Sequence, residues 1–255
     1  MNNVIDFGGR KEIFRCLVGS HNYNLNDESS DKDFKVFVSP TFDDLYCSNQ
    51  FSKSYIGDTE DLDVHDIRKV SSLWWKANVN FLEVLFSDEK TYFGYGENYN
   101  ERVKELLSEI FSMKDKIAKM NLPYLYNACI GMHLTKKKQV NKGTEGTQHL
   151  VDKYGYDTKQ ALHSWRILDF LRRFSDTNFN DFKSAIWYKN SDNKRKFLLD
   201  MKSGKYTLDE YYEIVKKTFE DVECHWEQIY QSRPVDNETN EKLLDIVKEI
   251  VRISL

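Results

Sequence analysis

Proline and glycine are scarce in this sequence, with 3 and 11 among 255 residues. Long flexible linkers, which are rich in such residues, are therefore not expected. No apolar run approaches the roughly 18 residues that a membrane-spanning helix requires. The first residues also lack the basic flank and apolar stretch of a secretory signal. These absences exclude the membrane-spanning and linker-rich classes and predict a soluble, cytoplasmic protein with no membrane partner.

Cysteine is sparse as well, and its spacing argues against a zinc site. The four cysteines are widely scattered, with no Cys-x-x-Cys pair, which fits reduced thiols in a cytosol. Hydrophobic residues, in contrast, make up 40% of the chain and aromatic residues 14%. That content is enough to build a packed core, so disorder is not expected.

The charges are distributed unevenly along the chain. The net charge is −4, but residues 27–66 carry 11 acidic and 3 basic side chains, against 30 acidic and 34 basic in the remainder. An acidic zone in a mildly basic body fits a cation site that faces an anionic ligand. A solvated acidic loop is the more ordinary interpretation. The choice between a cation site and such a loop therefore depends on the motifs within residues 27–66.

Hydrophobic periodicity predicts two lobes of different composition. Apolar runs and alternation predict strands over residues 13–18, 33–38 and 62–67, and a period near 3.6 predicts a helix over 71–86. Further helices are predicted over 99–120, 124–138, 158–174, 208–229 and 240–253. The predicted class is α+β, with a small mixed-sheet lobe over residues 1–96, a helical-bundle lobe over 97–255, and a boundary near Gly96.

Paired carboxylates mark the second predicted strand. Asp31 and Asp33 are two residues apart, so they point to the same face and repel each other unless a cation lies between them. Mg²⁺, or Mn²⁺ as an alternative, prefers such hard oxygen ligands. Two ions about 4 Å apart stabilise the attacking and departing oxygens of a phosphoryl displacement. A third carboxylate would come from Asp61 or Asp63, and the spacing does not choose between them.

Gly19 and Ser20 follow the first predicted strand, where the chain must turn. Glycine permits a close backbone approach, and the following N–H groups with the Ser20 hydroxyl suit triphosphate oxygens. The turn and the acidic pair are each weak signals, since either is common at a strand end or on a surface. Together, with eleven residues from Ser20 to Asp31, they indicate a site for a metal-bound triphosphate.

The longer pattern resembles a known family. Gly-Ser-His-x-Tyr at 19–23, Ser-Asp-x-Asp at 30–33 and Asp-Val-His-Asp-Ile-Arg-Lys at 63–69 resemble the signature of the DNA polymerase beta-like nucleotidyltransferases. They are most similar to a bacterial and phage subfamily of predicted nucleotidyltransferases, some of them linked to RNA repair. Three more segments resemble this subfamily: 80–86, 155–166 and 204–208. The resemblance therefore covers nearly the whole chain, in order.

The resemblance implies a polymerase beta-like palm in the first lobe and transfer of a nucleoside monophosphate from a magnesium-bound NTP. It matches Asp31 and Asp33 to the metal-binding pair. It matches Asp63, rather than Asp61, to the third carboxylate, which helps to deprotonate the attacking hydroxyl. The turn at Gly19-Ser20 matches the phosphate-binding turn. The expected partners are an NTP and an acceptor, with an RNA end favoured, whereas the base used and the oligomeric state do not follow from the sequence.

One position departs from the family pattern. The family usually has glycine where this chain has Asn24. Asparagine tolerates left-handed backbone geometry better than most residues, so the turn is expected to survive.

A cationic stripe is predicted on one helix of the second lobe. Lys159, His163 and Arg166 lie at i, i+4 and i+7, so they share a face. Such a stripe suits the phosphates of the NTP or the acceptor, and His163 suits proton transfer. A solvated helix face is the ordinary alternative. The nearby run Lys136–Lys138 is interpreted as a helix C-terminus rather than a nucleic-acid contact.

Two other functions fit the same residues. A metal-dependent phosphohydrolase or nuclease would use the same acids, and a nucleotide-binding module would keep the fold without turnover. Analysis of the products separates them, because only a transferase leaves label from an α-phosphate on an acceptor.

Overall fold

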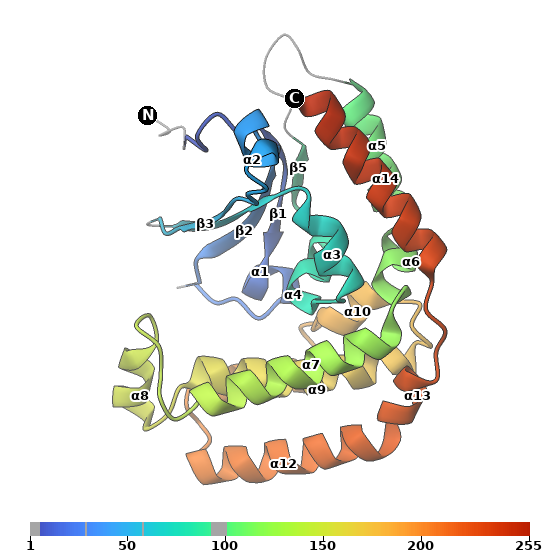
Figure 1. Ribbon diagram of the computed structural model, residues 1–255. Coiled ribbons are helices and arrows are strands. Elements are labelled where there is room, and N and C mark those ends of the chain that lie inside the picture. The colour runs from blue at the N-terminus through green and yellow to red at the C-terminus, as the bar shows by residue number, and fades with distance from the viewer. Residues whose placement is uncertain (1–5, 29, 58, 93–100) are drawn as a thin grey trace. The chain divides into compact units, whose positions relative to one another are not determined.

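The computed structural model describes residues 6–28, 30–57, 59–92 and 101–255, and it divides into two compact units (Figure 1). The first unit comprises residues 1–76, 80–120 and 236–255, and the second comprises 77–79 and 121–235. The first contains a sheet with helices, and the second is entirely helical. The predicted α+β class is therefore confirmed.

The first unit is built on a five-stranded mixed sheet (Figure 1). Its strands are β1 (Glu12–Val18), β2 (Lys32–Val38), β3 (Ser52–Tyr55), β4 (Glu60–Asp66) and β5 (Lys90–Tyr92), in the spatial order β3-β4-β2-β1-β5. β2 pairs with β4 in parallel, and the other pairs are antiparallel. The three predicted strands are confirmed as β1, β2 and β4, whereas the short β3 and β5 were not predicted.

The two faces of the central strands differ in chemistry, as the alternating sequence requires. One face is apolar, and its core cluster consists of Phe7, Phe34, Val36, Val38, Leu62 and Val64. Each such side chain stabilises the fold by about 1.5–3 kcal/mol when fully buried. On the other face, the register sets Asp33 beside Asp61 and Lys35 beside Asp63. The apolar side anchors the sheet, and the polar side is available for chemistry.

Short helices follow the strands of the first unit. They are α1 (Gly19–Tyr23), α2 (Phe42–Tyr46), α3 (Lys69–Trp75), α4 (Val79–Leu82) and the 3-10 helix η1 (Glu83–Phe86). The helix predicted over 71–86 is thus broken into three pieces. Ala77, which has a left-handed backbone with φ of 47°, interrupts it after α3.

Three further helices complete this unit: α5 (Glu101–Ser112), α6 (Lys114–Lys119) and α14 (Asn237–Ser254). α14 packs on α3, α5 and α6 and buries an apolar stripe that includes Leu243 and Ile250. This packing brings the C-terminal segment into the sheet unit, so the compact units differ from the predicted ranges 1–96 and 97–255. The predicted boundary at Gly96 and the predicted helix start at Tyr99 lie outside the described residues.

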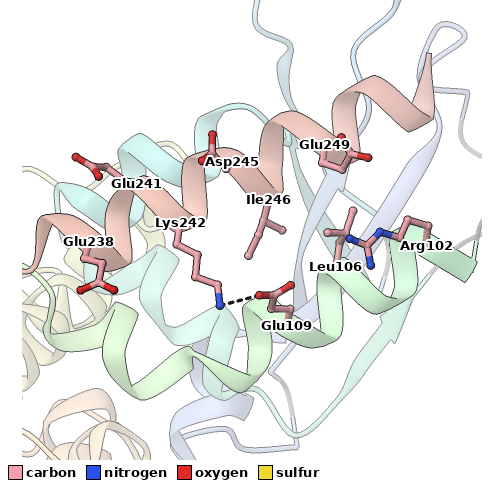
Figure 2. Close-up of a pocket in the computed structure, with 9 residues that line it drawn as sticks. All are labelled: Arg102, Leu106, Glu109, Glu238, Glu241, Lys242, Asp245, Ile246 and Glu249. Atoms are coloured by element: carbon pink, nitrogen blue, oxygen red, sulfur yellow. Dashed lines mark ion pairs between the residues drawn. The ribbon is translucent and has the colours of Figure 1, made fainter.

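A groove runs between α5 and α14 and is rich in carboxylates (Figure 2). Its lining residues are Arg102, Leu106, Glu109, Glu238, Glu241, Lys242, Asp245, Ile246 and Glu249. Lys242 Nζ lies 2.7 Å from Glu109 Oε1 and links the two helices. The groove includes none of the residues that the sequence motifs single out.

The second unit is a bundle around the long helix α9 (Thr158–Asp176). The surrounding helices are α7 (Leu122–Gln139), α8 (Gln148–Tyr154), α10 (Phe182–Ile186), α11 (Asn193–Lys202), α12 (Leu208–His225) and α13 (Glu227–Gln231). Asp157 is the N-cap residue of α9, and its carboxylate accepts the Gln160 backbone N–H at 2.9 Å. Most of α9 is buried, which confirms the predicted helical bundle. No helix within the described residues is long and apolar enough to cross a membrane.

Candidate functional site

Gly19 and the Asp33 carboxylate lie in direct contact at the end of β1. The antiparallel register of β1 and β2 pairs Val18 with Asp33. A Cβ atom added to Gly19 would lie 2.6 Å from Oδ2 of Asp33, and Gly19 has a φ of +71°. Both the contact and the left-handed backbone require glycine. The structure therefore brings the predicted turn and one predicted metal-binding acid together.

The buried side chain of Glu83 holds the same turn in place. One Glu83 oxygen, Oε2, accepts the Gly19 backbone N–H at 3.0 Å and the Asn22 Nδ2 amide at 3.1 Å. The other, Oε1, accepts a short hydrogen bond from the Tyr23 hydroxyl. A single carboxylate thus fixes three residues of the Gly-Ser-His-Asn-Tyr turn. The segment 80–86 was singled out only by resemblance, and this role of Glu83 was not predicted.

The turn continues in the geometry that the sequence predicts. Asn24 adopts φ 59° and ψ 41°, the left-handed conformation that glycine would favour, so the expectation for this position is confirmed. The Leu25 backbone N–H donates to the Ser20 carbonyl at 2.9 Å. His21 Nε2 lies 3.2 Å from the Ser30 carbonyl and ties the turn to the segment just before Asp31.

Asp63 lies on β4 between two basic side chains. Lys35 Nζ donates to Oδ2 of Asp63 at 2.6 Å, and His65 Nε2 lies 2.9 Å from the same oxygen. Burial alone would raise the pKa of Asp63, but His65 and Lys35 outweigh it and hold that pKa below its usual range. Asp63 is therefore ionised at neutral pH. Both contacts fall on Oδ2, and neither involves Oδ1.

The other candidate acids have different surroundings. Asp31 is exposed and precedes β2 by one residue. Asp61, beside Asp33 in the register, accepts the Gly57 N–H at 3.2 Å. The structure therefore sets Asp61 nearer to Asp33 along the strands and gives Asp63 the basic partners.

The donor chemistry suits a hard cation, because Asp33, Asp61 and Asp63 offer carboxylate oxygens on one face of the paired strands. The missing side chain of Gly19 leaves room for the Asp33 carboxylate, whose oxygens are of the kind that such an ion binds. Asp63 fits if its carboxylate shifts from Lys35 toward the ion. Over the described ranges, no group of three or more His, Cys, Asp and Glu side chains is gathered closely enough to hold a metal ion. The metal set Asp31, Asp33 and Asp63 thus remains a prediction.

An aromatic side chain packs against both basic partners of Asp63, which are Lys35 and His65. Phe81 lies under the Lys35 ammonium, with Nζ 4.2 Å from the ring centroid, and its ring meets that of His65 edge-on at 4.9 Å. Trp74 is buried, and its Nε1 donates to the Phe81 carbonyl at 2.9 Å, which fixes the backbone at Phe81. Lys35 and Phe81 were not identified from the sequence, since a lone lysine on a strand carries no motif.

Asp66 and Arg68, in the family-like segment 63–69, have a structural role. Asp66 is fully buried and accepts from both the backbone N–H and the guanidinium of Arg68. Asp66 raises the pKa of the Arg68 guanidinium, although burial opposes the change. This ion pair fixes the exit of β4 rather than contributing a ligand.

The predicted cationic stripe belongs to the second unit, on α9. Lys159 is exposed, His163 is half-buried and Arg166 is only 2% exposed. Burial, together with Arg166, Lys136 and other cations, lowers the pKa of His163 well below its usual value. This stripe is therefore not a fully solvated helix face. Its participation in the NTP site remains a prediction.

Comparison with known proteins gives one family. The family described as "RlaP: RNA repair pathway DNA polymerase beta family" matches residues 4–247. None of the curated proteins matches this chain. Among solved structures, the crystal structure of a nucleotidyltransferase-like protein from Exiguobacterium sibiricum 255-15 at 1.90 Å resolution is similar at 13% identity. Its TM-score is 0.28, and the match covers 96% of this chain and 70% of that chain.

Proposed function

The chain belongs to the RNA repair pathway DNA polymerase beta family, and from this premise we propose that it transfers a nucleoside monophosphate from an NTP to an acceptor. The membership confirms the family predicted from the motifs and makes the chain a polymerase beta-like nucleotidyltransferase. In the proposed reaction an acceptor oxygen attacks the α-phosphorus of the NTP. The bond to the bridging oxygen then breaks, and pyrophosphate leaves.

The contact between Gly19 and Asp33 is the observation that carries the proposal. A turn suited to phosphate oxygens and a carboxylate suited to their counter-ion lie within van der Waals distance. Gly19 donates its own N–H to Glu83, so the proposal assigns phosphate binding to Ser20 and the N–H groups after it. Gly19 contributes by leaving space.

The proposed cofactor is Mg²⁺, with Mn²⁺ as the alternative, held by Asp31, Asp33 and Asp63. When bound, such ions neutralise the triphosphate and stabilise charge on the entering and leaving oxygens. Lys35 and His65 keep Asp63 ionised, which suits a metal-binding carboxylate. Because a lowered pKa makes a carboxylate a weaker base, the proposed role of Asp63 in deprotonating the attacking hydroxyl rests on the family resemblance. We propose that the NTP phosphates are bound by the side chains of Lys159, His163 and Arg166.

An RNA end is the proposed acceptor. The description of the family refers to an RNA repair pathway, and every RNA end offers either a hydroxyl that can attack or a phosphate that can be recognised. The chain is acidic overall, with a pI near 5.9, so binding has to depend on local cationic groups rather than on overall charge.

The test uses each α-labelled NTP with Mg²⁺ and RNA of defined ends. Label retained on RNA is expected, whereas release of inorganic phosphate or cut RNA would indicate a hydrolase. Asp33→Asn and Asp63→Asn should each reduce transfer by at least about 100-fold while the fold persists. Asp61→Asn is the matched control, since it removes one carboxylate from the same strand. Full activity in Asp33→Asn would contradict the proposal, and loss in Asp61→Asn alone would reassign the third acid.

A further inference from the structure

A serine hydroxyl at the edge of the sheet is connected through His65 to Asp63. Ser52 Oγ lies 3.0 Å from His65 Nδ1, and the other ring nitrogen, Nε2, lies 2.9 Å from Asp63 Oδ2. These polar contacts run from β3 to β4 and end at a carboxylate of the candidate site. Ser52 was not identified from the sequence, because a lone serine on a short strand carries no motif.

The strand register places Ser52 on the polar face of the sheet. Ser52 pairs with His65 across β3 and β4, and paired residues on adjacent strands point to the same face. Phe51, which precedes Ser52, packs against the apolar core on the other face, as the alternation of a strand requires. Ser52 therefore shares its face with Asp33 and Asp63, the two acids proposed to bind the metal-bound NTP.

Ser52 is also accessible to a bulky reagent. The residue is exposed, and β3 is the outermost strand on its side of the sheet (Figure 1). Within the described residues, no further strand pairs with the outer edge of β3. A nucleotide can therefore approach the hydroxyl, whereas the histidine behind it is buried.

The imidazole between the serine and the carboxylate is held in one orientation. The ring of Phe81 meets that of His65 edge-on at 4.9 Å, and Asp63 lies beside Nε2. The negative carboxylate favours the tautomer that carries its proton on Nε2, so Nδ1 accepts from the Ser52 hydroxyl. A hydroxyl within hydrogen-bond reach of a base that a third group orients is the arrangement that activates a serine for nucleophilic attack.

We propose that Ser52 is an acceptor for the chain's own nucleotidyl transfer, so that the protein modifies itself at this hydroxyl. The inference rests on the proposed function, since it uses the NTP proposed to bind at Asp33 and Asp63. Ser52 Oγ attacks the α-phosphorus, the bond from that phosphorus to the bridging oxygen breaks, and pyrophosphate leaves with the electron pair. The Ser52 proton passes to His65 Nδ1 and then to water. The product is a phosphodiester that joins Ser52 to the nucleoside.

The transfer is expected within one chain rather than between two chains. A single side chain, that of His65, separates Ser52 from Asp63, so the nucleophile and the candidate site belong to one face of one sheet. The rate of labelling per chain should therefore be independent of protein concentration.

The experiment incubates the full chain with each α-labelled NTP and Mg²⁺ in the absence of RNA. The wild type should gain the label, and mass spectrometry should find one nucleoside monophosphate on Ser52. Ser52→Ala should lose the label, and Ser52→Thr, which keeps a hydroxyl, should retain part of it. Ser54→Ala is the matched control and should be labelled like the wild type, because Ser54 is an exposed serine on the same strand and face, paired with Asp63 rather than with His65. Circular dichroism checks the fold of each variant.

A mixing experiment tests whether the reaction occurs within one chain. Asp33→Asn keeps Ser52 but lacks a proposed metal ligand, whereas Ser52→Ala keeps that ligand but lacks the acceptor. When the two variants are mixed, neither should be labelled. Label on the Asp33→Asn chain, or labelling per chain that rises with concentration, would overturn transfer within one chain.

A parallel reaction with RNA separates this inference from the proposed function. Label on RNA with none on the chain overturns self-modification and leaves the proposed function standing. Label on the chain with none on RNA supports self-modification and contradicts the RNA acceptor. Label on neither contradicts both, and label that persists in Ser52→Ala overturns the assignment to Ser52.

Discussion

The α-carbon of Gly19 lies so close to the Asp33 carboxylate that a single methyl group would reach 2.6 Å from its Oδ2 atom. Van der Waals contact between carbon and oxygen requires more than 3 Å, so any side chain here displaces Asp33 or the turn. The strand pairing of Val18 with Asp33 sets this proximity. Glycine at this position is thus a requirement of the site as well as of the turn.

Gly19→Ala should therefore lower activity far more than it lowers stability. The φ of +71° costs about 1–2 kcal/mol for alanine, and displacement of Asp33 should reduce nucleotide transfer on the order of 100-fold. Gly155→Ala is the matched control, because Gly155 has φ +81° and no neighbour within 4 Å of the added Cβ. Thermal unfolding and transfer assays on both variants separate strain from displacement. Equal activity in the two variants would contradict the role given to the contact.

Glu83→Gln should loosen the turn from its buried side. A Gln side chain has one acceptor oxygen and an NH2 group that only donates, so it cannot accept the Gly19 N–H, the Asn22 amide and the Tyr23 hydroxyl together. A buried donor left unsatisfied costs about 1–3 kcal/mol, measured as the free energy of unfolding in urea. A loss in apparent NTP affinity beyond the loss in folded fraction would mark Glu83 as a positioning residue. Glu89→Gln, at an exposed glutamate, should change neither quantity.

The three central strands β1, β2 and β4 were predictable from the sequence because their periodicity is local. Alternation in β2 places Phe34, Val36 and Val38 in the core, and the same alternation places Asp33 on the polar face. The left-handed turn at Asn24 was also predictable, since the tolerance of asparagine for that geometry is an intrinsic property.

Other features depend on contacts that spacing does not reveal. The helix predicted over 71–86 breaks at Ala77, a residue with high helix propensity, because tertiary packing overrides propensity there. The partners of Glu83 lie some sixty residues earlier in the chain, and the pairing of Lys35 with Asp63 appears only with the parallel register. The return of α14 to the sheet unit is likewise a tertiary effect, so the predicted division near residue 96 omitted it.

The protonation of His163 predicts a pH dependence of stability. Burial and neighbouring cations lower the pKa of His163 in the folded chain, while the unfolded value is about 6.5. Below pH 6.5 His163 binds a proton in the unfolded chain but not in the folded chain. The free energy of unfolding therefore falls as the pH falls. His163→Gln should flatten this slope between pH 6.5 and 5. His133, whose pKa burial also lowers, should contribute a slope of the same sign, and an unchanged slope in His163→Gln would contradict the prediction.

Lys35→Met should strengthen binding of a divalent cation in the absence of NTP. Lys35 Nζ lies 2.6 Å from Asp63 Oδ2, so its charge competes with any cation that approaches that carboxylate. Its removal takes one positive charge from beside Asp63 and should tighten Mn²⁺ binding about tenfold, which corresponds to the roughly 1–2 kcal/mol that Coulomb's law gives for a repulsion across a few ångströms at the dielectric of water. Mn²⁺ titration followed by electron paramagnetic resonance measures the change. Lys32→Met, on the same strand but 3.6 Å from Glu89 rather than beside Asp63, should bind Mn²⁺ like the wild type. Weaker binding in Lys35→Met would mean that the lysine supports the acidic group instead of competing with the metal for it.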